Sequence, residues 1–256
     1  MSGLVIVWVG VFGLMVGSFL NVVIGRLPAG ESIVSPGSRC PACRTPIRWF
    51  DNIPALSYLL LGGRCRACGE GISIRYPLVE LATGVAFMLQ AVVFLDEPVV
   101  LGQRIVFTGM LVALFGTDLE TQRLPNVITL PGILVGLAFS TVVPPGVVAC
   151  ALGAALGAAI LALIRWGWER ATGVEGMGLG DVKMIAMIGA FLGWQQVWVV
   201  LFLSSIAGAV IGVALAALGG RSMQTKLPFG TFLALAAYAA SLVGDNLVTW
   251  YLGLYR

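Results

Sequence analysis

Residues 124–164 have the sequence LPNVITLPGILVGLAFSTVVPPGVVACALGAALGAAILALI, a run of 41 residues without a charged side chain. As one helix this run would be about 60 Å long, at about 1.5 Å per residue. A bilayer core is about 30 Å thick, so the run is too long for one crossing and long enough for two. Pro144-Pro145 lies near its middle and marks a break. The sequence therefore predicts a membrane protein with two spans in this run.

The composition of the whole chain favours the same class. Of its 256 residues, 59% are hydrophobic and 11% are charged, whereas soluble domains carry about 25% charged residues. The chain has no histidine, which excludes Ser-His-Asp and Cys-His nucleophiles and HExxH metal sites. Acid–base chemistry near neutral pH must therefore use carboxylates, Cys, Lys, Tyr or a bound metal. The net charge of +3 is small and argues against a nucleic-acid partner.

The other apolar runs predict six more spans. The uncharged run 184–220 is again too long for one crossing and is divided at 193–196. The remaining spans run from about Leu4 to Ile24, Tyr76 to Leu95, Val99 to Thr117, and onward from Phe229. The first has no basic residue before it and no cleavage signal after it, so we expect a retained helix. The predicted fold class is an all-α polytopic membrane protein with about eight transmembrane helices.

The basic residues predict the orientation of these spans. Seven arginines lie between the first two spans. Six further basic residues lie in other loops on the same side of the membrane, one of which is 165–180. These are Arg123, Arg165, Arg170, Lys183, Arg221 and Lys226. Only Arg104 and Arg256 fall on the other face. By the positive-inside rule the first face is cytoplasmic, and an even number of spans places both termini outside.

The segment 25–75, called the four-cysteine loop below, contains two CxxC pairs. The pairs are Cys40 with Cys43 and Cys65 with Cys68, and 21 residues separate them. This spacing is typical of a four-cysteine zinc site. Disulfides are the alternative, but the cytoplasm keeps thiols reduced. The loop is too short and polar to fold on its own core, so we expect structural zinc to stabilise it. Cys150 lies alone in a predicted span and is expected to pack there.

Two aspartates stand at predicted cytoplasmic ends of spans. Asp118 closes the third span, and Asp181 opens the sixth. Ionisable residues at membrane depth are costly, so function is the default hypothesis for both. The alternative is structural: Asp181 would favour a helix N-terminus, and Asp118 would pair with Arg123. Two carboxylates about 4 Å apart repel by roughly 4 kcal/mol at an effective dielectric near 20. Sharing one proton relieves this repulsion and suits an aspartic protease.

Gly176, Gly178 and Gly180 precede Asp181. Glycines accept positive φ and leave no side chain against an incoming strand, so we expect an extended peptide to lie beside the carboxylate. A dinucleotide-binding loop is a weak alternative, because the GxGxxG spacing is absent and a membrane helix precedes the glycines.

Several fragments together resemble one known family. They are GSFLNVVIGRLP at 17–28, the two cysteine pairs, NIPALS at 52–57, Asp118 followed by LPN at 124–126, and GLGDVK at 178–183. In order, spacing and topology they resemble the prepilin peptidases, or type IV leader peptidases. These are bacterial inner-membrane aspartic proteases of the GxGD kind.

The resemblance implies that Asp118 and Asp181 are the catalytic pair. It also implies that the substrates are type IV prepilins and type II secretion pseudopilins in the bilayer. Each carries a short basic leader, which is cut off after a glycine. Members with the four cysteines commonly also N-methylate the new first residue with S-adenosylmethionine, although no residue here identifies the methyl-donor site. Gly178, Gly180 and Lys183 would form the substrate loop. Lys183 is alternatively a membrane-surface anchor, or its charge favours the ionised form of the nearby Asp181.

The resemblance also implies the organisation of the chain: a first transmembrane helix at 1–24, the zinc-binding loop at 25–75, and a peptidase domain at 76–256. The protein would lie in the bacterial inner membrane with its active site facing the cytoplasm. A transporter or proton pathway also uses paired aspartates and broken helices. No clear repeat relates the two halves, however, and both aspartates lie near one face. A structural zinc-bearing scaffold is a third possibility.

Overall fold

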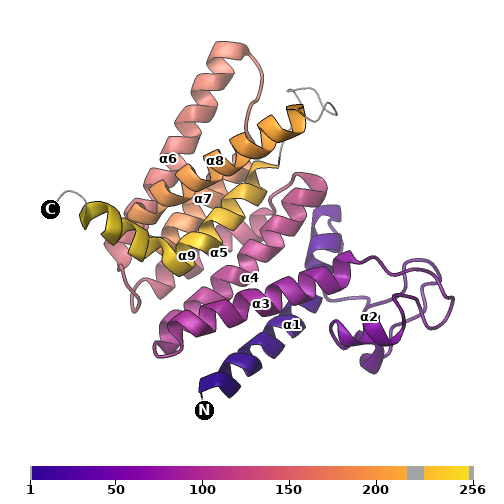
Figure 1. The fold of residues 1–256 in the computed structure, drawn as a ribbon. Coiled ribbons are helices and arrows are strands. Elements are labelled where there is room, and N and C mark those ends of the chain that lie inside the picture. Colours follow the sequence, from indigo (N-terminus) through magenta and orange to yellow (C-terminus); the bar gives the residue numbers. More distant parts are fainter. Residues whose placement is uncertain (1, 218–227, 254–256) are drawn as a thin grey trace. The chain divides into compact units, whose positions relative to one another are not determined.

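The computed structural model is helical throughout and describes residues 2–217 and 228–253 (Figure 1). Arg221, Lys226 and Arg256, which helped to predict the orientation, lie outside the described residues. The chain divides into two compact parts, Met1–Leu101 (unit 1) and Gly102–Arg256 (unit 2).

Unit 1 is built on two long helices, α1 (Ser2–Arg26) and α3 (Arg75–Phe94), which pack along each other. Their backbones approach closely, since a Cβ added to Gly17 would lie 2.7 Å from the Cα of Glu80. Small residues permit such approaches between membrane helices, where packing and hydrogen bonds take the place of the hydrophobic effect.

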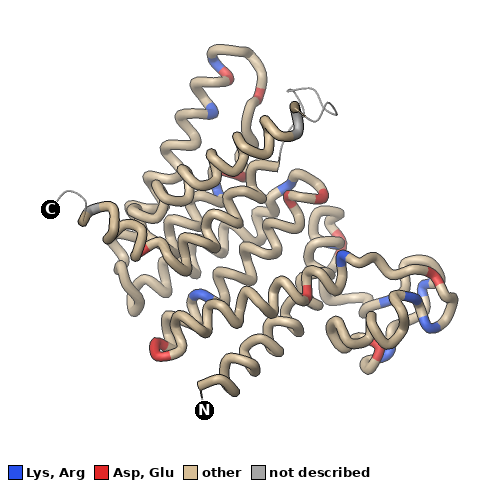
Figure 2. Tube along the Cα trace, viewed as in Figure 1, with Lys and Arg blue, Asp and Glu red and all other residues tan. Residues whose placement is uncertain are grey.

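The four-cysteine loop joins these two helices with short elements. These are the 3-10 helices η1 (Leu27–Ala29) and η2 (Trp49–Asn52), the helix α2 (Leu56–Leu60), and two isolated bridges, Arg39 with Pro46 and Arg64 with Gly71. Figure 2 shows the basic residues of unit 1 gathered on the four-cysteine loop, which follows α1 and precedes α3 along the chain. Their concentration in this loop is the signal that predicts its cytoplasmic location.

Unit 2 holds the remaining helices. They are α5 (Asn126–Phe139), α6 (Val147–Thr172), α7 (Leu179–Leu192), α8 (Trp194–Ala217), α9 (Phe229–Gly253) and most of α4 (Pro98–Thr121). The central helix is α7, which packs on α5, α6, α8 and α9 and is buried continuously from Met184 to Leu192. The ring of Phe107 on α4 stacks on Phe191 of α7 with centroids 4.7 Å apart. Cys150 is fully buried on α6, which confirms its expected packing role.

The long helices lie where the apolar runs predict spans, and Pro144-Pro145 and Gly193 separate helices as expected. In the described part of the chain, six helices are long and apolar enough to cross a membrane: α1, α3, α4, α6, α8 and α9. The chain is thus a multi-pass membrane protein. Helices α5 and α7 have 14 residues each, or about 21 Å at 1.5 Å per residue. Eight crossings therefore stay a prediction.

The predicted loop at 165–180 needs correction. Helix α6 continues to Thr172 and ends at Gly173, which adopts a left-handed φ of +70°. Arg165 and Arg170 thus lie on the helix, beyond its apolar stretch. The sequence boundary was drawn where charge begins, whereas the helical hydrogen bonds continue until a glycine ends them.

Candidate active site and metal centre

The two predicted catalytic aspartates both belong to unit 2. Asp118 lies in the last turn of α4 and Asp181 in the first turn of α7, and they are 4% and 8% exposed. Leu124 faces both Gly180, the neighbour of Asp181, and Gly230, which lies beside Asp118, so the two aspartates share one site. The Oδ2 atom of Asp118 accepts a hydrogen bond of 2.8 Å from the backbone N–H of Thr231. The structure thus brings the aspartates together and orients one of them through α9.

Backbone approaches at the starts of two helices shape this site. A Cβ added to Gly180 would lie 2.9 Å from the Cβ of Leu124. A Cβ added to Gly230 would lie 2.9 Å from Oδ2 of Asp118 and 3.1 Å from Cδ1 of Leu124. Leu124 therefore packs against both glycines, and a methyl group at either would force a neighbour to move.

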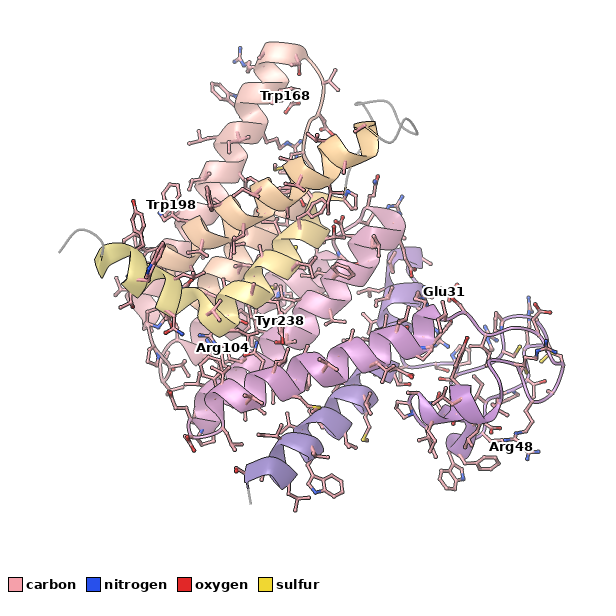
Figure 3. All side chains as sticks on the ribbon, viewed as in Figure 1. Glu31, Arg48, Arg104, Trp168, Trp198 and Tyr238 are labelled. Carbon is pink, nitrogen blue, oxygen red and sulfur yellow. The ribbon has the colours of Figure 1, made fainter. Side chains whose placement is uncertain are left out.

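The glycine loop, residues 176–180 before Asp181, has a packing role that the sequence did not predict. None of its three glycines is among the described residues with positive φ, and Gly178 is extended with φ −73°. Two of them instead make room for side chains. A Cβ on Gly176 would lie 2.5 Å from Cδ1 of Trp168 (Figure 3), and Gly180 faces Leu124. A Cβ on Gly178 would make only an ordinary 3.5 Å contact with Asp181, so Gly178 is the roomiest of the three positions.

Lys183 makes a contact that neither sequence hypothesis included. Its Nζ donates a 2.9 Å hydrogen bond to Oδ1 of Asn126, the first residue of α5. This bond joins the first turns of α5 and α7. Sequence reasoning also missed Gly230 and Thr231, although Pro228 directly before an apolar run signals a helix start with unpaired backbone donors.

The four cysteines of unit 1 converge on one point. Their sulfur atoms all lie within 4.8 Å of one another, and those of Cys40 and Cys68 are 3.8 Å apart. Tetrahedral zinc with Zn–S bonds of about 2.3 Å places its sulfurs roughly 3.8 Å apart, whereas a disulfide needs about 2.05 Å. The cysteines are therefore arranged as a set of metal ligands.

The two CxxC turns repeat one backbone design. The N–H of Arg44 donates to the carbonyl of Cys40 at 2.9 Å, and the N–H of Gly69 donates to that of Cys65 at 2.9 Å. Both donors adopt a left-handed backbone, with φ of +59° and +74°. Each turn is thus locally formed, and the thiols of the two turns converge.

Polar contacts fasten the rest of the four-cysteine loop. Arg66 donates hydrogen bonds to both carboxylate oxygens of Asp51, the shortest of 2.7 Å, and these bonds hold the pKa of Asp51 below its usual range. Glu80 at the start of α3 accepts a 2.7 Å hydrogen bond from the backbone N–H of Ala55. Ala55 has a φ of +56°, in the left-handed region that non-glycine residues rarely adopt.

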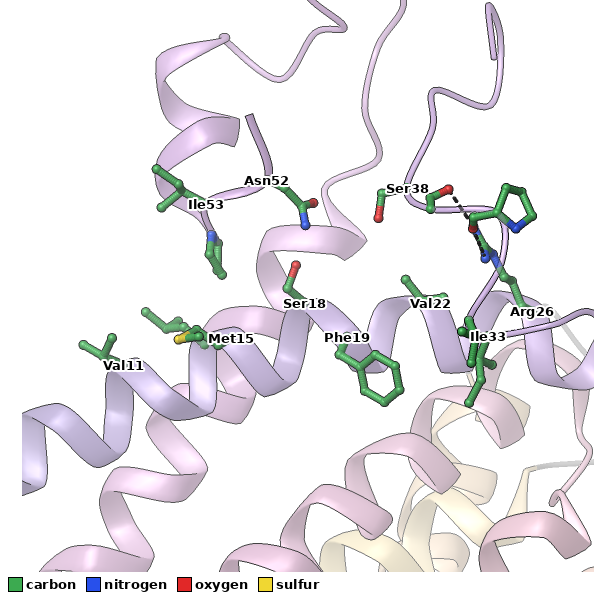
Figure 4. A pocket seen from close by; sticks show the side chains of 15 residues that line it. Val11, Met15, Ser18, Phe19, Val22, Arg26, Ile33, Ser38, Asn52 and Ile53 are labelled. Carbon is green, nitrogen blue, oxygen red and sulfur yellow. Dashed lines mark hydrogen bonds between the residues drawn. The ribbon is translucent and has the colours of Figure 1, made fainter. Parts of the chain in front are cut away.

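Unit 1 also contains two adjoining hollows. The larger, called the polar cavity below, has a volume of about 820 Å³ and many charged wall residues. The smaller is an apolar groove of about 580 Å³ beside α1. Figure 4 shows Val11, Met15 and Ser18 along α1 in this groove, with Asn52 and Ile53 across from them.

Comparisons with known proteins agree on one family. The model described as "Bacterial Peptidase A24 N-terminal domain" matches residues 11–94, and the model described as "Type IV leader peptidase family" matches residues 105–213. The first match lies in unit 1 and the second in unit 2.

Curated relatives cover almost the whole chain. A protein of Aeromonas salmonicida is 40% identical over 94% of this chain and 91% of its own length. Proteins of Pseudomonas aeruginosa and Neisseria gonorrhoeae are 38% and 39% identical over 94% of this chain, covering 91% and 93% of their own lengths. All three are named "Prepilin leader peptidase/N-methyltransferase". No solved structure gives a significant match.

Proposed function

Because the chain belongs to the prepilin leader peptidase/N-methyltransferase family, we propose that it removes the leaders of type IV prepilins and type II secretion pseudopilins and then methylates the new amino terminus. The observation that carries the peptidase activity is the pair of buried aspartates, Asp118 and Asp181, held together in unit 2. The family assignment does not favour the transporter that the paired aspartates also suggested.

The pair Asp118 and Asp181 would work as one acid and one base. A carboxylate takes a proton from the attacking water, and its protonated partner donates one to the leaving amine. The N–H of Thr231 fixes one oxygen of Asp118 and so limits how its carboxyl group turns. The substrate must be extended at the scissile bond, because a helix shields its own peptide groups. The extended backbone at Gly178 is the position where such a strand would pair.

The second activity would belong to unit 1. Cys40, Cys43, Cys65 and Cys68 would hold one structural zinc ion, which their sulfur spacing supports. The printed names of the relatives include an N-methyltransferase, and S-adenosylmethionine is the methyl donor we assign. When bound, it supplies an electrophilic methyl group to the free amine. The sequence-based division into 1–24, 25–75 and 76–256 stays part of this proposal.

We also propose that the chain crosses the bacterial inner membrane eight times. The four-cysteine loop and the aspartates would face the cytoplasm and both termini the periplasm, as the distribution of basic residues supports. Cysteine labelling from each side of intact cells tests this topology. Labelling of a C-terminal cysteine from the cytoplasm only would contradict it.

The test of both activities is a reaction of purified protein with a prepilin in detergent. Mass spectrometry should detect a product shortened by the leader, and with S-adenosylmethionine a product heavier by one methyl group. An unchanged prepilin mass would contradict the peptidase, and a shortened but unmethylated product would contradict only the methyltransferase.

A further inference from the structure

The polar cavity of unit 1 has no part in the aspartate chemistry, which belongs to unit 2. Its walls come from the end of α1, the four-cysteine loop and the start of α3. A volume of about 820 Å³ lies in the range of about 300–1,000 Å³ that is usual for small-molecule and cofactor sites. Cys40 and Cys65 stand in the wall, so the proposed metal would hold part of it in place.

One buried wall residue has an acceptor oxygen to which no described group donates a hydrogen bond. Asn21 is 3% exposed, and its Nδ2 donates to the carbonyls of Gly17 at 3.3 Å and Tyr76 at 3.0 Å. Because both neighbours are carbonyls, the amide orientation is fixed. Its Oδ1 has no partner among the residues that the structure describes. A buried acceptor without a donor is costly, so a ligand with hydroxyl or amino groups would be stabilised there.

The wall carries charges of both signs. Its five arginines are Arg26, Arg39, Arg48, Arg66 and Arg75, and its four carboxylates are Glu31, Asp51, Glu70 and Glu80. A wall with charges of both signs suits a ligand that carries a carboxylate and cationic groups. Tyr58 and Tyr76 add aromatic surfaces suited to a nucleobase.

The backbone above the cavity is strained. Ala55, a wall residue, keeps its φ of +56° while its N–H donates to Glu80. A left-handed non-glycine residue costs free energy and is found mainly at binding and catalytic sites. The apolar groove shares Ser18, Val22 and Asn52 with the polar cavity. The apolar side chain of the residue that is methylated could therefore lie in this groove, beside the ligand.

We propose that the polar cavity is the binding site for S-adenosylmethionine. In it the Oδ1 of Asn21 accepts a hydrogen bond from the ligand, and wall arginines and carboxylates bind its amino-acid end. This inference rests on the proposed methyltransferase activity and adds where the methyl donor binds. Three features of the cavity fit this ligand: the Oδ1 of Asn21 that lacks a donor, the charges of both signs in the wall, and the volume.

The test fills the cavity with a side chain where the backbone has room. Gly25 on α1 and Gly71 in the four-cysteine loop both line the cavity. A Cβ at Gly25 would meet only Arg75, at 3.8 Å, and one at Gly71 would meet nothing within 4 Å. Gly25→Phe and Gly71→Phe should each weaken binding of tritiated S-adenosylmethionine, measured by equilibrium dialysis of the full-length protein, by roughly tenfold to a hundredfold.

Gly3→Phe is the matched control, because Gly3 also lies on α1, has nothing within 4 Å of its Cβ position and is outside the cavity. It should bind the methyl donor as the wild type does. Zinc content and prepilin cleavage, followed in parallel, check that unit 1 and unit 2 of each variant are folded. Normal binding by both cavity variants would overturn the assignment of the site. A wild type that binds no S-adenosylmethionine would instead overturn the methyltransferase activity itself.

Discussion

The four-cysteine loop and helix α7 are stabilised in opposite ways. The loop leaves large apolar side chains exposed, with Val34 at 85% and Trp49 at 81%, and its described order rests on turns and a few polar contacts. Helix α7 has no exposed face between Met184 and Leu192 and is enclosed by its neighbours. We therefore expect the loop to depend on a bound metal, whereas the surroundings of Asp181 are fixed by packing.

This contrast separates two kinds of mutational effect. A change at a metal ligand should affect the whole loop, because four thiols at one point hold its two halves together. A change at an aspartate should alter chemistry and leave the packed helices in place. The predictions below test this separation.

The largest effect is expected for Cys40→Ser. Loss of a thiolate from a four-cysteine site removes most of the metal affinity, which for structural zinc is about 10–16 kcal/mol. Purified wild type should contain one zinc ion, and the variant almost none. Limited proteolysis should then cut the four-cysteine loop, and methyl-donor binding should fail.

Cys150→Ser is the control for this change, because Cys150 is buried in unit 2 and does not belong to the four-cysteine cluster of unit 1. It should retain the zinc content and the proteolysis pattern of the wild type. Native protein without metal and with both cysteine pairs oxidised would contradict the metal site.

The next largest effect is expected for Asp118→Asn and Asp181→Asn. An amide keeps the size of the side chain but provides neither a base nor an exchangeable acid proton. Each change should reduce single-turnover prepilin cleavage by roughly 10²–10⁴-fold. The double variant should be hardly slower, since residues that act as a unit are not additive.

Zinc content should not change in these aspartate variants, because the metal ligands belong to unit 1. Methylation of a substrate that has already been cut should also persist. Near-normal cleavage by either single variant would remove that aspartate from the mechanism.

Much of the fold could be predicted because membrane spans and metal sites leave local signals. Uncharged runs located the long helices, and the proline pair and Gly193 located the breaks between them. The CxxC spacing identified the four cysteines whose sulfur atoms converge in the structure. These features depend on chain composition over short windows, which a single sequence provides.

What could not be predicted depends on tertiary contacts. The hydrogen bond from Thr231 to Asp118 joins residues 113 positions apart, and Gly230 approaches the same carboxylate. The sequence showed that the glycines near Asp181 tolerate positive φ, but it could not show that close packing on Trp168 and Leu124 requires two of them. The unpaired oxygen of Asn21 likewise depends on the partner helix α3.

A moderate effect is expected for Gly230→Ala. Its methyl group would stand 2.9 Å from Oδ2 of Asp118, so the carboxylate or the start of α9 must move. Overpacking of this kind costs about 1–3 kcal/mol, and cleavage should slow by roughly tenfold to a hundredfold while zinc is retained. Gly102→Ala on α4 is the control, since nothing lies within 4 Å of its Cβ position. Equal cleavage rates for the two variants would show that the approach to Asp118 is unimportant.

The smallest effect is expected for Lys183→Met, and it decides between the roles considered for Lys183. The structure directs Nζ to Asn126 at 2.9 Å, and the bond is exposed. Its loss should cost about 1 kcal/mol of stability and slow cleavage only a few-fold. Asn126→Ala should cost a similar amount, and the double variant should cost no more than either single change, because both remove the same bond. The pH profile of cleavage should stay in place if Lys183 serves to join α5 and α7. A displaced profile in Lys183→Met but not in Asn126→Ala would instead assign Lys183 to the electrostatics of Asp181.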